Sequence, residues 1–231
     1  MPHAVKSGKS GSRGEPEKTR AAILKAALEE FSHEGVTGAR TEEIARRAGV
    51  NKALLYYYFK DKEGLYTAAL EEVFSGLHEK VTSALSRTDL PPRERLLLYV
   101  RTHFDYIASA PVYPRLLQRE FMRSAGRTLS AAGSKIMEQH GKPLYNRMQK
   151  LIEEGIASGD FRRVNPVQTV TSILGTIVFY FISLPAQQIM LAGDPASPER
   201  IAQRRTAVAD FIGAAIFTPA AHKAITRERT Q

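Results

Sequence analysis

The spacing of apolar residues is the feature that most limits how this chain can fold. Apolar side chains recur every three or four residues in most segments, as at Ile23, Ala27 and Phe31, and no segment alternates apolar and polar residues with the period of a strand. This spacing places the apolar side chains on one face of a helix. The sequence therefore predicts an all-α protein of about nine helices.

Glycine, proline and short polar residues mark the ends of the predicted helices. The first helix is expected to begin at Pro16 and to end near Gly35, and three N-caps are expected for the next three helices, at Thr41, Asn51 and Asp61. The later helices are predicted over residues 93–109, 113–124, 130–158, 166–192 and 198–217. Pro185 is expected to kink or break the helix over 166–192.

Composition and motif searches argue against an enzyme. The chain has no cysteine, which excludes disulfides, thiolate metal sites and cysteine nucleophiles. Its six histidines show no paired metal-ligand spacing, and no phosphate-binding or nucleophile motif is present. His103 and His140 lie on predicted helices of the C-terminal half, where a hydrogen-bonded core or surface role is the simpler interpretation. The sequence therefore predicts no catalytic residue, no metal and no cofactor.

Two segments bear on location. The N-terminal segment has lysines and arginine among Ser and Gly but no apolar run, so it is not predicted to be a signal peptide. The apolar stretch over residues 173–191 is interrupted by polar residues and Pro185, which favours a buried helix over a membrane span. A cytoplasmic protein without a membrane partner is expected.

The two short predicted helices, 41–48 and 52–59, are joined by Gly49, Val50 and Asn51. A glycine that takes the left-handed conformation, an apolar residue in the angle and a capping residue form a connection typical of a helix-turn-helix motif. Such a motif presents its second helix to the major groove of DNA. The net charge of +9 is compatible with this partner but does not by itself indicate it.

Residues 18–75 resemble the TetR/AcrR family of bacterial transcriptional repressors. The positions that carry the resemblance are Ile23, Ala26, Ala27, Phe31, Gly35, Thr41, Ile44, Ala45, Ala48, Gly49, Val50, Leu55, Tyr56, Tyr58, Phe59, Lys62, Glu63 and Leu65. The family fold implied is a three-helix DNA-binding domain followed by a C-terminal helical bundle. Asn51 and Leu54 depart from the usual pattern, and an apolar Leu54 in the groove would favour a thymine methyl group.

The resemblance also implies roles for single residues at a near-palindromic, double-stranded operator. It implies phosphate contacts by Thr41 and Lys62, base contacts by Lys52, Ala53 and Leu54, and backbone or base contacts by Tyr56 and Tyr57. Because three consecutive tyrosines cannot share one helix face, at least one is expected to pack inward, and Tyr57 is the one favoured for DNA. Lys52 suits a guanine edge.

The C-terminal half is expected to bind a small effector and to form a homodimer. A cavity for an apolar or aromatic molecule is predicted among the helices that carry His103, Phe104, Phe121, Met148 and Phe179, although a filled core explains each residue as well. The helix over 166–192 is apolar around most of its circumference, so a second subunit is expected to cover part of it. The residues predicted at this interface are Phe179, Ile182, Phe211 and Ile216.

These expectations give a domain plan and a function. Residues 1–15 are predicted to be a flexible basic arm, 16–62 the DNA-binding domain, 63–217 the ligand-binding and dimerisation domain with a connecting helix over 63–87, and 218–231 a tail. The predicted function is a ligand-responsive, sequence-specific regulator, a repressor released from its operator by an apolar or aromatic effector. A ligand-binding helical protein without operator binding and a helical enzyme are the alternatives.

Overall fold

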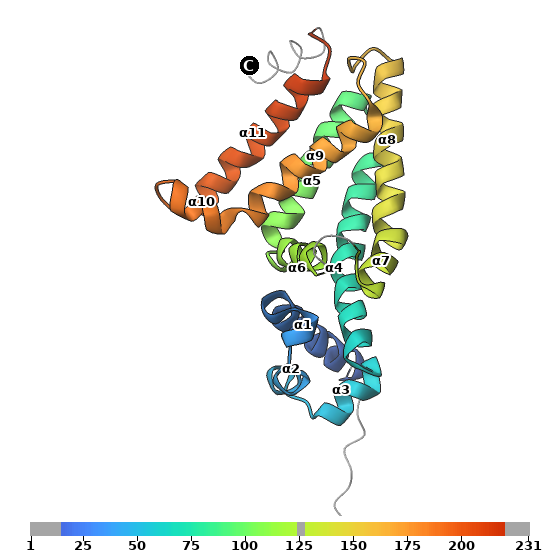
Figure 1. Ribbon diagram of the computed structural model, residues 1–231. Coiled ribbons are helices and arrows are strands. Elements are labelled where there is room, and N and C mark those ends of the chain that lie inside the picture. Colours follow the sequence, from blue (N-terminus) through green and yellow to red (C-terminus); the bar gives the residue numbers. More distant parts are fainter. Residues whose placement is uncertain (1–14, 124–127, 220–231) are drawn as a thin grey trace, which may run out of the picture. The chain divides into compact units, whose positions relative to one another are not determined.

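The computed structural model describes residues 15–123 and 128–219. Within these ranges the chain forms α-helices and no strand, apart from an isolated bridge between Phe161 and Phe217 (Figure 1). The predicted all-α class is confirmed. The predicted basic arm and C-terminal tail fall almost entirely on residues 1–14 and 220–231, outside the described residues.

The chain forms two compact units, residues 1–69 and 70–231. The division falls inside α4 (Lys62–Leu85), within the segment predicted as a connecting helix. The first unit holds α1 (Glu15–Gly38), α2 (Thr41–Ala48), α3 (Lys52–Phe59) and the start of α4. The functional boundaries proposed from the sequence, at residues 62 and 63, stay a prediction.

The first unit is built around apolar side chains from each of its helices. Ile23, Phe31, Ile44, Leu55 and Leu65 are fully buried. The rings of Phe31 and Tyr66 meet edge to face, with centroids 5.0 Å apart, so α1 packs on the start of α4. Gly35 interrupts α1 with φ 66° and ψ 175°, the break predicted near this glycine, and helical geometry then resumes up to Gly38.

The second unit is a bundle of the remaining helices. It contains the rest of α4 and α5 (Pro92–Ser109), α6 (Val112–Met122), α7 (Ala131–Ile136), η1 (Met137–Gly141), α8 (Lys142–Ala157), α9 (Pro166–Ile182), α10 (Leu184–Met190) and α11 (Pro198–Ile216). Helix α5 packs against α8, α9 and α11, and α9 also packs against α6 and α8 (Figure 1). The buried centre includes Tyr99, Phe104, Ile107 and Leu116.

Two of the predicted helices are divided in the structure. The one over 130–158 contains η1, a single π-helical turn between α7 and α8. The one over 166–192 breaks at Ser183 into α9 and α10, which bend by 66° just before Pro185. The break predicted at this proline is confirmed.

By length and composition alone, α9 and α10 taken together could cross a membrane, but the pair is bent by 66°. In the parts of the chain that the structure describes, no single helix is long and apolar enough to cross a membrane.

Candidate DNA interface and ligand cavity

The turn between α2 and α3 has the geometry that its residues predict. Gly49 takes the left-handed conformation, with φ 69° and ψ 27°. Its N–H donates to the carbonyl of Arg46 at 3.2 Å, and the N–H of Val50 donates to the carbonyl of Ala45 at 3.0 Å. Asn51 then caps α3, since its side-chain oxygen accepts from the N–H of Leu54 at 2.7 Å. The turn is therefore closed by hydrogen bonds on both sides.

Helix α3 has one buried face and one exposed face. Leu55 and Phe59 point into the core of the first unit, whereas Lys52 and Ala53 are exposed and Tyr57 is 81% exposed. Leu54, Tyr56 and Tyr58 are half-buried, so none of the three tyrosines is fully in the core. A face of this kind is free to contact a groove of DNA.

Acidic residues of α2 hold the nearby cations in place. Lys52 forms a salt bridge with Glu42, which raises the pKa of Lys52 and lowers that of Glu42. Arg46 and Arg47 both donate to Glu43 at 2.7 Å, and these bonds lower the pKa of Glu43 to about 2. A phosphate contact by these cations would exchange one anionic partner for another, whereas a base contact would exchange a carboxylate for a neutral acceptor.

Thr41 and Lys62, the two residues predicted to bind phosphates, are both engaged with other parts of the first unit. The predicted N-cap role of Thr41 was wrong, because Arg40 occupies the N-cap and Thr41 begins α2. Thr41 is only 6% exposed, and its hydroxyl lies 3.2 Å from the hydroxyl of Tyr56. Lys62 is half-buried and donates to the carbonyl of Thr37 at 3.2 Å. Their phosphate contacts stay predictions.

The exposed surface beside the motif includes two cations that the sequence prediction left out. Arg40 precedes α2, and Lys60 follows α3 with the positive φ of 64°. Both are exposed at helix ends. The sequence already indicated these two residues, because cations at the boundaries of the two short helices are placed to contact DNA phosphates.

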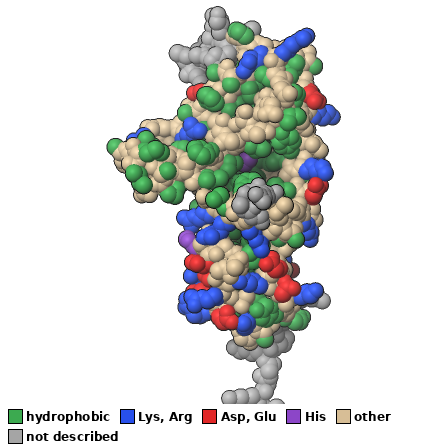
Figure 2. Space-filling view, in the orientation of Figure 1, with side chains coloured by type: hydrophobic (Ala, Val, Ile, Leu, Met, Phe, Trp, Pro, Cys, Tyr) green, Lys and Arg blue, Asp and Glu red, His purple; other side chains and the backbone are tan. Residues whose placement is uncertain are grey.

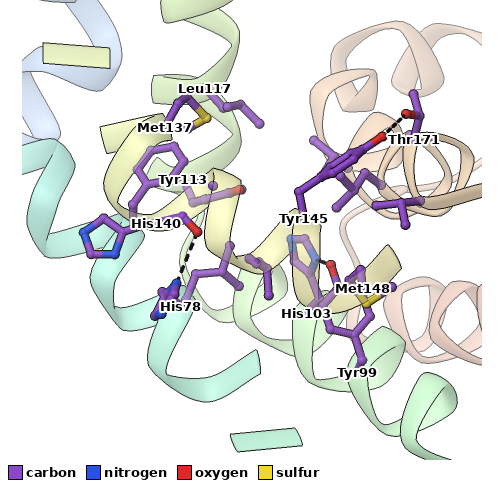
Figure 3. Close-up of a pocket in the computed structure, with 18 of the residues that line it drawn as sticks. His78, Tyr99, His103, Tyr113, Leu117, Met137, His140, Tyr145, Met148 and Thr171 are labelled. Carbon is purple, nitrogen blue, oxygen red and sulfur yellow. Dashed lines mark hydrogen bonds between the residues drawn. The ribbon is translucent and has the colours of Figure 1, made fainter. Parts of the chain in front are cut away.

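The second unit contains a cavity of about 430 Å³ (Figures 2 and 3). Side chains from α4, α5, α6, η1, α8 and α9 form its wall. The described residues that line it are Phe74, Leu77, His78, Tyr99, His103, Tyr113, Leu117, Phe121, Met137, His140, Gly141, Leu144, Tyr145, Met148, Val170, Thr171, Leu174, Gly175, Val178, Phe179 and Ile182. None of them is Lys, Arg, Asp or Glu, so the wall suits an uncharged, mainly apolar molecule.

Four of the five residues predicted for the ligand site line this cavity: His103, Phe121, Met148 and Phe179. The prediction for Phe104 was wrong. Phe104 is fully buried and packs on Phe181 of α9, with ring centroids 5.0 Å apart, so it belongs to the core. The sequence prediction missed Tyr99, although Tyr99 and His103 stand one helical turn apart on α5.

Histidines and tyrosines supply the polar groups of the wall (Figure 3). The hydroxyl of Tyr99 lies 3.0 Å from Nδ1 of His103. His140 bonds Glu71 through Nε2 at 2.8 Å, and its carbonyl lies 3.2 Å from Nδ1 of His78. The hydroxyl of Tyr145 lies 3.0 Å from that of Thr171. Two nitrogens in this set, Nε2 of His103 and Nδ1 of His140, have no hydrogen-bond partner among the described residues.

The residues predicted for a dimer interface are not equally exposed. Phe179 is 67% and Phe211 63% exposed, and Ile182 is half-buried. Ile216 is only 5% exposed, so the prediction that it offers surface to a partner was wrong. Figure 2 shows hydrophobic side chains gathered over α10, where Ile189 is 88% exposed.

Within the described ranges, no group of three or more His, Cys, Asp or Glu side chains is placed to hold a metal ion.

The geometry defines a class: a helix-turn-helix protein with a second, cavity-bearing helical unit. Residues 23–69 match the family described as bacterial regulatory proteins, tetR family, and residues 92–212 match the tetracyclin repressor-like C-terminal domain. The chain belongs to the TetR family of bacterial transcriptional regulators. It is a ligand-responsive, DNA-binding regulator of transcription.

Individual relatives of the chain are also transcriptional regulators. The transcriptional repressor NicS of Pseudomonas putida is 33% identical over 156 residues, which cover 67% of this chain and 71% of NicS. The transcriptional regulator RutR of Escherichia coli K12 is 30% identical over 177 residues, covering 77% of this chain and 80% of RutR. The structure of the ketosteroid transcriptional regulator KstR2 of Mycobacterium tuberculosis shares the fold, with a TM-score of 0.69 at 21% identity over 92% of this chain and 98% of that one.

Proposed function

We propose that the protein is a homodimeric repressor that leaves a near-palindromic operator when a small, largely apolar effector enters the cavity of the second unit. The main support for the proposal is that one chain has both an exposed face on α3, which includes Tyr57, and a cavity of about 430 Å³ lined by uncharged residues. The relative NicS is itself a repressor. With DNA as its partner, the protein acts in the cytoplasm. This role requires no catalytic residue.

The proposal for DNA is a division of labour around α3. Lys52, Ala53 and Leu54 would meet base edges, Tyr56 and Tyr57 would contact bases or backbone, and Thr41 and Lys62 would bind phosphates on either side. The exposure of Lys52, Ala53 and Tyr57 supports this division. In a dimer, two such helices about 34–36 Å apart would read successive turns of one face of the duplex.

The proposal for assembly rests on uncovered apolar surface. Phe179 and Phe211 are more than half exposed on α9 and α11, two helices that pack together. Large exposed apolar groups on helices of one unit mark a surface that another chain covers. A two-fold dimer would bury both faces at once.

The test has three measurements. Duplexes selected from a random pool by the wild type should share a near-palindromic sequence, and light scattering at micromolar concentration should give the mass of a dimer. A panel of uncharged aromatic compounds should include some that raise the melting temperature and release the selected duplex. A protein that selects no sequence at physiological salt would contradict the regulator mechanism, and compounds that bind without releasing DNA would contradict induction.

A further inference from the structure

His103 is a buried polar residue whose hydrogen bonds are only half satisfied. It lies on α5, is 1% exposed and lines the cavity (Figure 3). Its Nδ1 lies 3.0 Å from the hydroxyl of Tyr99, whereas its Nε2 has no hydrogen-bond partner among the described residues. A buried polar atom without a partner is unfavourable, so such an atom on a cavity wall points to a group that the cavity is built to receive.

The neighbour of His103 determines which kind of group this is. Tyr99 is fully buried, which raises the pKa of its phenol, so the phenol keeps its proton at neutral pH. Burial also lowers the pKa of His103 to about 4, so its imidazole is neutral and carries one proton. Among the described residues Nδ1 of His103 is the only hydrogen-bond partner of the Tyr99 hydroxyl, so the phenol proton is satisfied only when it is donated to Nδ1. We therefore assign the imidazole proton to Nε2. Nε2 is therefore a buried donor that needs an acceptor.

We propose that His103 anchors the effector through one hydrogen-bond-accepting oxygen, a ketone or similar carbonyl, on an otherwise apolar and uncharged molecule. This inference rests on the proposed effector role of the cavity. A charged ligand would find no opposite charge there, because the described lining contains no Lys, Arg, Asp or Glu. His140 also has one ring nitrogen without a partner among the described residues, but its ring is paired with Glu71 and its side chain is 16% exposed, whereas His103 is 1% exposed and has no charged partner within the described ranges.

Two matched probes isolate this hydrogen bond. Benzophenone and 1,1-diphenylethylene have the same two rings and nearly the same shape, but only benzophenone has a carbonyl oxygen in place of a methylene group. Binding is measured by calorimetry, with the protein titrated into each probe. Benzophenone labelled with carbon-13 at the carbonyl adds a signature, because a hydrogen bond to the oxygen moves the carbonyl resonance downfield.

The wild type should bind benzophenone about tenfold more tightly than 1,1-diphenylethylene, a factor typical of one buried hydrogen bond. His103→Phe should remove this preference by weakening ketone binding alone, and the downfield shift should disappear. His103→Gln keeps an N–H donor near the position of Nε2, so it should restore both the preference and the shift. Circular dichroism melting shows that each variant is folded.

The possible results distinguish the role of His103 as an anchor from the role of the cavity as an effector site. Equal affinity for the two probes, or an unchanged carbonyl shift in His103→Phe, would overturn the anchor and leave the cavity as an effector site. Val178→Trp fills the cavity and should abolish binding of both probes. If the probes still bind this variant they bind elsewhere, and the anchor is wrong. If neither probe binds the wild type, the effector role of the cavity fails and the anchor fails with it.

Discussion

The salt bridge between Lys52 and Glu42 bears directly on how Lys52 can bind DNA. In the free protein it is paired with Glu42, so any contact with a guanine edge must replace that salt bridge. We expect Lys52→Ala to weaken binding to the selected operator by about 1–3 kcal/mol while changing binding to random DNA little. Fluorescence anisotropy with both duplexes at several salt concentrations measures the two effects.

Lys62 should respond differently, because a phosphate contact carries no sequence information. Lys62→Ala should weaken specific and non-specific binding alike and reduce the salt slope by about one unit. Lys150→Ala, which removes an exposed charge from α8, is the matched control and should leave the slope unchanged. Equal behaviour of the Lys52 and Lys62 variants on both duplexes would contradict the assigned roles.

His103 should also link stability to pH. Its pKa in the folded chain is about 4, below the ordinary value of 6.5, so the unfolded chain takes up a proton first as the pH falls. Stability from this residue is therefore present above pH 6.5 and is lost as the pH drops towards 4, by about 2 kcal/mol between pH 7 and pH 5. Urea unfolding at both pH values should show a smaller loss for His103→Gln than for the wild type or for His33→Gln, a change at an exposed histidine.

At the scale of the helix, the cap of α3 has a measurable value. The side chain of Asn51 accepts the N–H of Leu54, which would otherwise lack a partner at the start of the helix. Asn51→Ala should reduce the free energy of unfolding by about 1 kcal/mol, and Asn51→Ser, which can accept the same bond, should cost much less. Equal losses in urea unfolding would show that the cap contributes little.

Helix α8 is fixed at its C-terminal end by close packing of a glycine. A Cβ added at Gly155 would lie 2.2 Å from the ring of Phe161, and that ring stacks on Phe217 with centroids 5.5 Å apart. Gly155→Ala should therefore destabilise the protein by about 1–3 kcal/mol, although alanine is the better helix former. In a Phe161→Leu background the same change should cost less, because the ring is gone. A stabilised single variant would contradict this packing.

Local rules explain which parts of this arrangement were predictable. The caps at Asn51 and Asp61 were predictable because a cap depends only on contacts within one helical turn. Each side chain accepts the N–H of the residue three positions later, Leu54 and Gly64 respectively. Thr41 was expected to cap α2, but Arg40 takes that position and the Thr41 hydroxyl lies 3.2 Å from that of Tyr56, fifteen residues further along the chain. No pattern within one helix reports such a contact.

The same limit applies to the cavity and the dimer face. Phe104 and His103 are neighbours on one apolar stripe, yet His103 meets the cavity and Phe104 meets Phe181. Which side of a stripe faces a void depends on the helices packed around it, so the sequence indicated the right helices and only some of the residues. Ile216 was misassigned for the same reason, since its own chain already buries it.

For the molecule as a whole, the exposed aromatic rings of α9 and α11 make assembly the property to test. Phe211→Asp should place a charge where a partner would cover it, giving a monomer by light scattering and weakening operator binding, because two half-sites can no longer be held together. Ile216→Val, inside the same helix but buried, is the control and should remain a dimer. A Phe211→Asp dimer with full operator affinity would rule out this surface.

The π-helical turn over Met137–Gly141 makes the effect of a deletion depend on its position in the chain. Each residue of an α-helix turns the following side chains by about 100°, and a π-turn accommodates one residue more than an α-turn. Deleting one residue there would allow a regular helix to run from α7 into α8 with Leu144 and Met148 still on the cavity wall, whereas a deletion in the first α-helical turn of α8 would rotate both side chains away from it. A deletion of one residue would therefore be tolerated at the π-turn, but within α8 it would change what the protein can detect.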